Sequence, residues 1–273
     1  MKTYRFFTAI LMVALCFNFV SCGDDDDNGG EPNPNTPKMR VTKIELTSNN
    51  QSIHATMDYT YSENKVSKVT ISVSGEDIPW SGSGSKKPWI LEYKYQDDKV
   101  SITQTNDHFY DEGSFTDVWT LNKEGFIESS ENTTYVYSDG YLQSIKNGSN
   151  VYVNFTYDQN GNLTQNMDID GYDKITYTDI PNIGGLYVAY RDNDGVYPFS
   201  CGNGDSYFFS GLMGKATKYL PKEASAEDGY LRFNYELDDY GYVKTVKIEE
   251  YYEDSGEKTT NNWTETYTYE EVK

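Results

Sequence analysis

The stretch VYVNFTYDQNGNLTQNMDI, from Val151 to Ile169, decides the fold of this chain. Apolar and polar residues alternate in it on both sides of the sequence Asp158-Gln159-Asn160-Gly161. Period-2 alternation places the apolar side chains on one face of a pleated ribbon, and Asn-Gly supplies the positive-φ positions that a tight turn needs. The stretch therefore predicts a β-hairpin with one apolar face. The residues of that face are Val151, Val153, Phe155, Tyr157, Leu163, Met167 and Ile169.

The same pattern recurs along most of the chain from Met39 onward, as Tyr-rich strands that end in short polar turns. Successive units begin roughly 16 to 34 residues apart, which is too irregular for the fixed rungs of a solenoid. An open sheet of this width rarely stays open, so it is expected to curl and cover its apolar side. The prediction is an all-β fold: a many-stranded antiparallel meander over residues 39–273 that closes into a barrel-like or strongly curved sheet.

The composition agrees with this prediction and argues against some partners. The chain has 26 Tyr and a mean hydropathy of -0.73, so the aromatic face is expected to point inward and the polar face toward water. The formal net charge of -20 argues against nucleic acid and against anionic lipid as partners, because both would repel the protein.

One segment interrupts the strand pattern. Residues 179–229 are rich in Pro and Gly, and apolar residues from Phe208 to Leu220 recur at helical spacing before Pro221. This predicts one short helix near residues 206–220, packed as a plug against the apolar face of the sheet. A lid that moves over a ligand is the alternative.

The first 21 residues have the form of a secretory leader. Lys2 and Arg5 precede an apolar run that ends at Val20, and Ser21 and Cys22 follow. A cysteine at this place resembles the bacterial lipobox, in which the thiol is acylated and the leader is cut before it. We expect Cys22 to carry the lipid; a plain signal peptide with an incidental cysteine is the alternative.

An acidic block follows the cysteine. Asp24, Asp25, Asp26 and Asp27 lead into an Asn- and Pro-rich run, so residues 22–38 are expected to form a solvated tether. Such a block also resembles the surface-export signal of Bacteroidota outer-membrane lipoproteins. The expected location is therefore the outer membrane with the protein facing the cell exterior; the periplasmic face is the alternative.

Few residues suggest catalysis or metal binding. The chain has two histidines, His54 and His108, both expected at the surface, and Cys201 is expected to be a small buried residue. Asp192 and Asp194 resemble a fragment of a calcium loop, as does the run from Asp168 to Asp173, but each lacks the later bidentate Glu. No cofactor is expected. With 43 acidic residues, a carboxylate pair that hydrolyses glycosides stays open as an alternative.

Trp80 is the residue that most suggests a binding site. It lies in Ile78-Pro79-Trp80-Ser81-Gly82-Ser83-Gly84, a small-residue loop in which a large ring has little core to enter. Exposed aromatic rings stack on the apolar faces of sugars, and loops carry binding residues. The alternative is that Trp80 folds back onto the sheet or the helix.

Two family resemblances rest on these motifs. Residues 157–164, with the sequence YDQNGNLT, are similar to the YD repeat of Rhs proteins, which we ascribe to shared hairpin chemistry. The leader, the acidic block, the Tyr-x-Tyr hairpins and the run from Gly211 to Pro221 together resemble a family of uncharacterised Bacteroidota surface lipoproteins, a domain of unknown function with a porin-like fold. This resemblance implies a many-stranded barrel-like domain and brings no catalytic residues.

The sequence thus favours a surface lipoprotein without enzymatic activity that contacts the membrane only through its lipid. Its expected partner is an extracellular glycan or another envelope protein. A carboxylate-dependent hydrolase and a purely structural envelope component are the alternatives.

Overall fold

The structure is a computed structural model that describes most of the chain beyond the tether. The described residues are 36–48, 54–74, 87–105, 113–130, 132–167, 174–188, 210–227, 229–254 and 257–272. None of them forms a helix long and apolar enough to cross a membrane.

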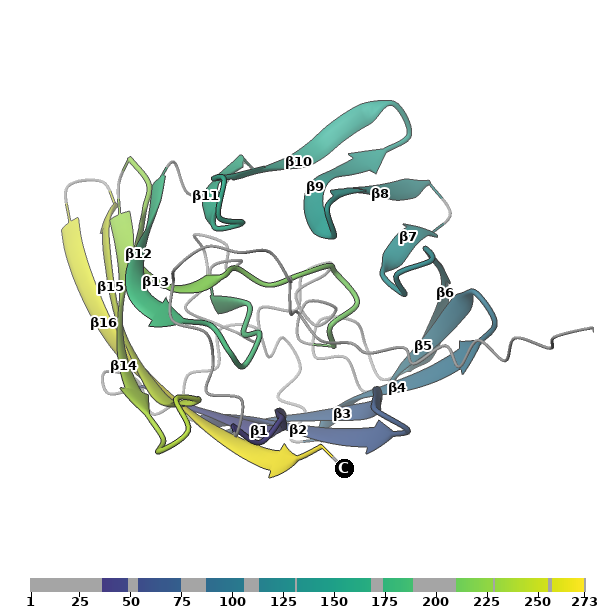
Figure 1. The fold of residues 1–273 in the computed structure, drawn as a ribbon, viewed down its shortest axis with the longest axis horizontal. Helices are drawn as coiled ribbons and strands as arrows, with labels where there is room; N and C mark the ends of the chain where they lie inside the picture. The colour runs from purple at the N-terminus through teal and green to yellow at the C-terminus, as the bar shows by residue number, and fades with distance from the viewer. Residues whose placement is uncertain are drawn as a thin grey trace, which may run out of the picture.

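One antiparallel sheet of 16 strands makes up the fold (Figure 1). Its order runs from β11 to β1 and continues from β16 to β12, so nearly all neighbours in the sheet are also consecutive in sequence. The pairing of β1 with β16 lets the sheet curve into a nearly closed barrel whose two edges are β11 and β12. This confirms the predicted antiparallel meander. The strands are β1 (Met39–Ser48), β2 (His54–Ser62), β3 (Lys65–Ser74), β4 (Trp89–Gln96), β5 (Lys99–Thr105), β6 (Ser114–Leu121), β7 (Ile127–Ser130), β8 (Thr133–Ser138), β9 (Tyr141–Asn147), β10 (Asn150–Tyr157), β11 (Leu163–Met167), β12 (Lys174–Pro181), β13 (Tyr219–Ser225), β14 (Gly229–Leu237), β15 (Val243–Asp254) and β16 (Glu257–Glu271).

The predicted hairpin is formed by β10 and β11, and its turn is held by one side chain. Oδ1 of Asp158 accepts hydrogen bonds from the backbone N–H groups of Asn160 and Asn162, at 2.8 and 2.9 Å. Gly161 has a φ of 76°, a conformation in which a Cβ would be strained. The carboxylate and the glycine together fix the turn and therefore the register of the two strands.

Apolar and aromatic side chains fill the inside of the barrel. Leu46, Leu91 and Trp263 have between 0 and 2% of their surface exposed. The outer face of the strands is polar and includes Thr60, Glu92, Lys94, Asn234, Lys247 and Thr260. A barrel that faces lipid carries an apolar band on its outside; this outer face is instead suited to water, as predicted.

Tyrosine hydroxyls tie neighbouring strands together on the inner face. Each donates a hydrogen bond of 2.6 to 2.8 Å to the backbone carbonyl of an apolar residue at the start of the preceding strand in the barrel. We call these contacts tyrosine ties. The pairs in the described part of the chain are Tyr61 to Val41, Tyr137 to Ile127, Tyr157 to Leu142, Tyr177 to Leu163, Tyr235 to Pro221 and Tyr269 to Val243.

The predicted helix near 206–220 is wrong for the residues that the structure describes. Ser210 to Lys218 form turns and irregular chain, and Tyr219 begins strand β13. Gly211 and Gly214 have φ values of 76° and 94°, which no α-helix contains.

The same segment nevertheless acts as the predicted plug. Leu212 and Met213 are only 3% and 1% exposed. The carbonyl of Leu212 accepts a hydrogen bond from the N–H of Ile127, and the N–H of Lys215 donates to the carbonyl of Gly140, both at 2.8 Å. Because these backbone groups bond to the barrel wall, the segment needs no helix to satisfy them.

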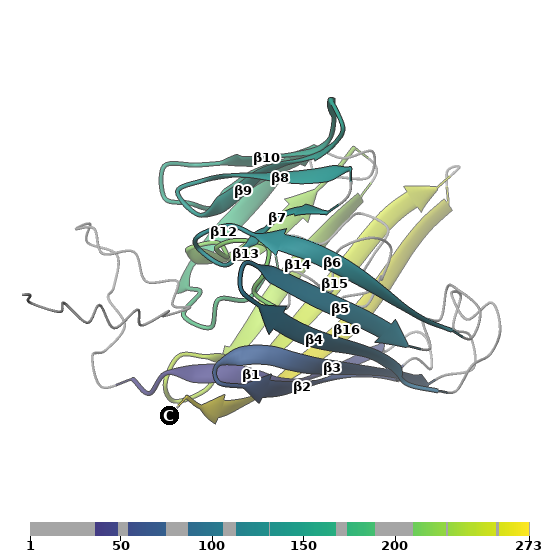
Figure 2. The same ribbon diagram turned by 90° about the vertical axis from the view of Figure 1, so that its right-hand side faces the viewer.

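The two ends of the barrel differ. One end, which we call the N-terminal end, carries the start of β1 and the turns that follow β2, β4, β8, β10 and β14 (Figure 2). There the hydroxyl of Tyr242 donates to the carbonyl of Pro37 at 3.0 Å and accepts from the N–H of Met39 at 3.1 Å. The opposite end, which we call the far end, is where β3 ends at Ser74 and β14 begins at Gly229.

Candidate functional site

Most of the site residues predicted from sequence lie outside the described residues, and their roles stay predictions. These are Cys22, Asp24, Asp25, Asp26, Asp27, Trp80, His108, the run from Asp168 to Asp173, Asp192, Asp194 and Cys201. His54 is described: its side chain is 46% exposed on β2, and its Nε2 lies 3.5 Å from Oε1 of Glu45. Within the described ranges, no group of three His, Cys, Asp or Glu side chains is placed to hold a metal ion.

Among the described residues, two carboxyl groups lie inside the barrel. Glu265 is fully buried and accepts a hydrogen bond from the hydroxyl of Tyr267 at 2.7 Å. Burial raises the pKa of Glu250, and this rise is opposed by the hydrogen bond from the Asn261 amide, at 2.7 Å, and by the indole of Trp263.

These two groups do not form a glycosidase pair. Glu250 stands opposite Asn261 of β16. Asn261 and Glu265 are four residues apart on that strand, so their Cα atoms are separated by about 13 Å. The two carboxyls of a glycosidase need an open space between them that holds the sugar. Here the ring of Trp263, 1% exposed, occupies the same face between the two positions. Their role is therefore within the packed interior.

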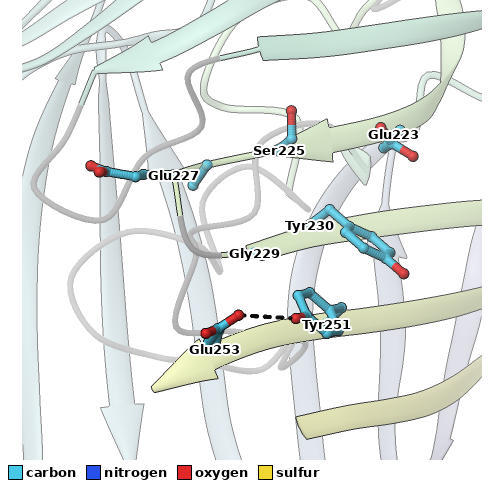
Figure 3. A pocket seen from close by; sticks show the side chains of 8 residues that line it. Glu223, Ser225, Glu227, Gly229, Tyr230, Tyr251 and Glu253 are labelled. Atoms are coloured by element: carbon cyan, nitrogen blue, oxygen red, sulfur yellow. Dashed lines mark hydrogen bonds between the residues drawn. The ribbon is translucent and has the colours of Figure 1, made fainter. Parts of the chain in front are cut away.

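A groove on the outer face is the stronger candidate for a site. It has a volume of about 520 Å³ and lies where β13, β14 and β15 meet at the far end of the barrel (Figure 3). Its lining residues are Glu223, Ser225, Ala226, Glu227, Gly229, Tyr230, Tyr251 and Glu253. The groove is open to solvent and combines aromatic rings, a hydroxyl and carboxylates.

Two tyrosine rings form one wall of the groove. Tyr230 and Tyr251 stand opposite each other on β14 and β15, with ring centroids 5.3 Å apart and planes inclined by 17°. The guanidinium of Arg232 lies 4.5 Å from the centre of the Tyr230 ring. A ring held by a stacked neighbour and a cation loses little freedom when a ligand binds, so this wall is rigid before binding.

Ion pairs hold the base of this wall. Arg232 contacts Oε2 of Glu223 at 2.9 Å and Oε1 of Glu249 at 3.1 Å. The hydroxyl of Tyr230 donates to Glu249 at 2.9 Å, and this bond is the main reason why the pKa of Tyr230 is raised. The pairing with Glu223 is the main reason why the pKa of Arg232 is raised. One guanidinium thus pairs with two carboxylates at the base of the wall.

The floor of the groove requires glycine. A Cβ on Gly229 would lie 2.5 Å from the carbonyl oxygen of Tyr251, which is closer than any real contact. Beside Gly229, the hydroxyl of Tyr251 donates a hydrogen bond to Glu253 at 3.3 Å (Figure 3). The remaining polar lining includes Glu227, whose side chain is exposed.

The sequence interpretation missed this groove, although a signal for it exists. Counting outward from the Asp238–Gly241 turn places Tyr230 near Tyr251 on the polar face of a predicted hairpin. Aromatic side chains on a polar face are unusual and would have marked the site.

Comparisons with known proteins bear on the fold. No family model and no curated protein matches the chain. Among solved structures, a porin-like protein from Bacteroides uniformis is similar, with a TM-score of 0.63 and 20% sequence identity, over 84% of this chain and 98% of that chain. At this identity the likeness concerns the fold alone, and it agrees with the porin-like fold that the sequence resemblance implied.

Proposed function

We propose that this protein is an outer-membrane lipoprotein, anchored through acyl chains on Cys22, that displays its barrel outside the cell as a binding module without enzymatic activity. The leader and the acidic block support the anchor and the export, and the porin-like fold is consistent with an outer-membrane protein. The polar outer face supports a barrel that stands in water beside the membrane.

The proposed lipid anchor would orient the barrel relative to the membrane. The tether predicted for residues 22–38 meets the barrel at its N-terminal end, where Tyr242 binds Pro37. The far end, with the groove, would therefore point away from the lipid. A large extracellular ligand could reach it without contacting the membrane.

The observation that carries the proposal is the rigid pair of Tyr230 and Tyr251 beside carboxylates in a solvent-filled groove. Sugar rings stack their apolar faces on aromatic side chains, and their hydroxyls donate to carboxylates and to Ser or backbone groups. A glycan is therefore the ligand that this lining fits best.

The contacts of the groove carboxylates favour binding over hydrolysis. Glu223 is occupied by Arg232, and Glu253 accepts from Tyr251. An acid catalyst needs a carboxyl whose pKa is raised, and Glu250, which has a raised pKa, faces the packed interior. Turnover of a polysaccharide panel by the purified protein would contradict this part of the proposal.

A glycan array probed with the full-length protein tests the ligand. We expect Tyr251→Ala to weaken the binding of any hit roughly 2- to 12-fold, which corresponds to the 0.5–1.5 kcal/mol typical of an aromatic contact. Tyr240→Ala is the matched control, because Tyr240 is 55% exposed at the other end of the barrel. Trp80→Ala tests the predicted loop site separately.

The outcomes separate the hypotheses. Loss of binding with Tyr251→Ala but not with Tyr240→Ala supports the groove, and loss with Trp80→Ala alone moves the site to that loop. The absence of any hit on the array rejects the glycan and leaves a docking or structural role in the envelope. Protease treatment of intact cells tests the location: a protein that survives would be periplasmic, contrary to the proposal.

A further inference from the structure

The two edges of the sheet, β11 and β12, are joined by a tyrosine tie although no ladder pairs them. The hydroxyl of Tyr177 on β12 donates to the carbonyl of Leu163 on β11 at 2.7 Å. At the same end, the backbone N–H of Tyr219 donates to Oδ1 of Asn162 at 3.0 Å. The seam of the barrel is therefore bridged at its N-terminal end.

The other five tyrosine ties join strands that are paired, and they obey one register rule. In each, the residue two positions after the carbonyl acceptor stands opposite the residue three positions before the tyrosine. The pairs are Lys43 with Asp58, Ser129 with Thr134, Ser144 with Asn154, Glu223 with Arg232, and Thr245 with Thr266.

The rule has a structural basis. The strand that carries the acceptor has one extra residue directly after it, which shifts the pairing with the strand on its other side. In β15, for example, the acceptor Val243 stands opposite Leu237, whereas Thr245 stands opposite Glu236. This β-bulge turns the acceptor carbonyl toward the inner face, where the tyrosine of the following strand reaches it. Strand β11 has the same shift: Gln165 stands opposite Thr156 of β10, whereas Leu163 stands opposite Tyr157.

We infer that β11 and β12 pair with each other and close the barrel, in the register that this rule sets. Two residues after Leu163 is Gln165, and three before Tyr177 is Lys174, so Gln165 stands opposite Lys174. The register shift then brings Leu163 level with Ile175, and both side chains are buried, at 0% and 5% exposure. Facing side chains of an antiparallel pair share one face, as these do.

Closure has a consequence for partners. An open seam would offer two rows of unpaired backbone groups, to which an extended peptide or a second copy could add a strand. A closed seam offers neither, so a partner cannot add a strand there. The seam ladder, held by one tie and short strands, is also the part of the wall expected to open first.

Paired cysteines test the register. In a full-length background with Cys16, Cys22 and Cys201 changed to Ser, Gln165→Cys with Lys174→Cys should form a disulfide on mild oxidation. Directly opposed residues have Cα atoms about 4.5–5.5 Å apart, within the range of a disulfide. Gln165→Cys with Thr176→Cys is the matched control, because a displacement of two residues takes the Cα atoms beyond about 7 Å.

We expect near-complete cross-linking of the first pair and little of the second, measured by mass spectrometry of the oxidised and reduced proteins. Equal cross-linking of the two pairs would refute the register. Failure of the first pair in a protein with native circular dichroism would show an open seam. Tyr177→Phe gives a second measurement: faster exchange than in the wild type at the one of Lys174 and Ile175 whose N–H points toward β11 supports closure, and unchanged exchange there contradicts it.

Discussion

Replacing Tyr157 with Phe removes one tyrosine tie and leaves the ring in place. The hydroxyl donates to the carbonyl of Leu142 at 2.8 Å, and the ring packs against Tyr141 with centroids 5.1 Å apart. The substitution keeps the ring contact but leaves a buried carbonyl without this donor. A hydrogen bond of this kind contributes about 0.5–1.5 kcal/mol, so we expect a loss of about 1 kcal/mol in the free energy of unfolding.

This loss should appear as a fall of about 2–4 °C in Tm for a domain of this size. Thermal and urea unfolding, followed by circular dichroism, would measure it. Tyr61→Phe and Tyr235→Phe remove ties on other strand pairs, so their effects should add to within about 0.5 kcal/mol. Tyr240→Phe is the control, because that ring is 55% exposed. If Tyr157→Phe unfolds at the same temperature as Tyr240→Phe, the ties do not stabilise the barrel.

Two further predictions concern pH and the plug. Burial raises the pKa of Tyr61 to about 12, against about 10 in an unfolded chain. The folded protein therefore favours the neutral hydroxyl. The free energy of unfolding should hold below pH 10 and fall between pH 10 and 12. Tyrosinate absorbance and circular dichroism should then change together, and gradual ionisation near pH 10 without unfolding would contradict this. Met213→Ala, in a residue 1% exposed, should cost about 2–5 kcal/mol in urea unfolding, whereas Val118→Ala, 52% exposed, should change stability by less than about 0.5 kcal/mol. Equal effects of the two substitutions would show that the plug is not packed.

The alternation of apolar residues was sufficient to predict the sheet. Val153, Phe155 and Leu163 are buried, as the alternation in residues 151–169 predicts, because a strand has only two faces and here one of them is shielded from water. Val151 is 49% exposed, since the register shifts between it and Val153 at the rim of the barrel. Periodicity carries no information about such a shift.

The plug shows why the helix prediction failed. Spacing of i, i+3 and i+4 indicates a helix only when one side of the segment is buried. The segment from Leu212 to Leu220 passes through the barrel mouth and is covered on several sides, so its apolar residues follow the contacts of the wall. Gly211 and Gly214, at positive φ, were the sequence signal against a helix.

Tyr230 and Tyr251 flank one predicted hairpin, but the place of Glu223 beside them depends on the pairing of β13 with β14, which the sequence does not display. Tyr230, Tyr251 and Glu223 come from three strands, and only the observed register brings them together. Sequence motifs that indicate function lie in loops or form metal-binding and catalytic patterns. An aromatic pair on the water-facing side of a regular sheet falls outside both categories.

Pairing of the first strand with the last has a consequence for how the chain is made. Met39 stands opposite Glu271, so the two parts of the sheet, β1 to β11 and β12 to β16, cannot join until residue 271 has been synthesised. Contacts between such distant residues form slowly. Because the two ends of the barrel sequence meet side by side, joining them and opening a short turn elsewhere should give a permuted protein with the same architecture.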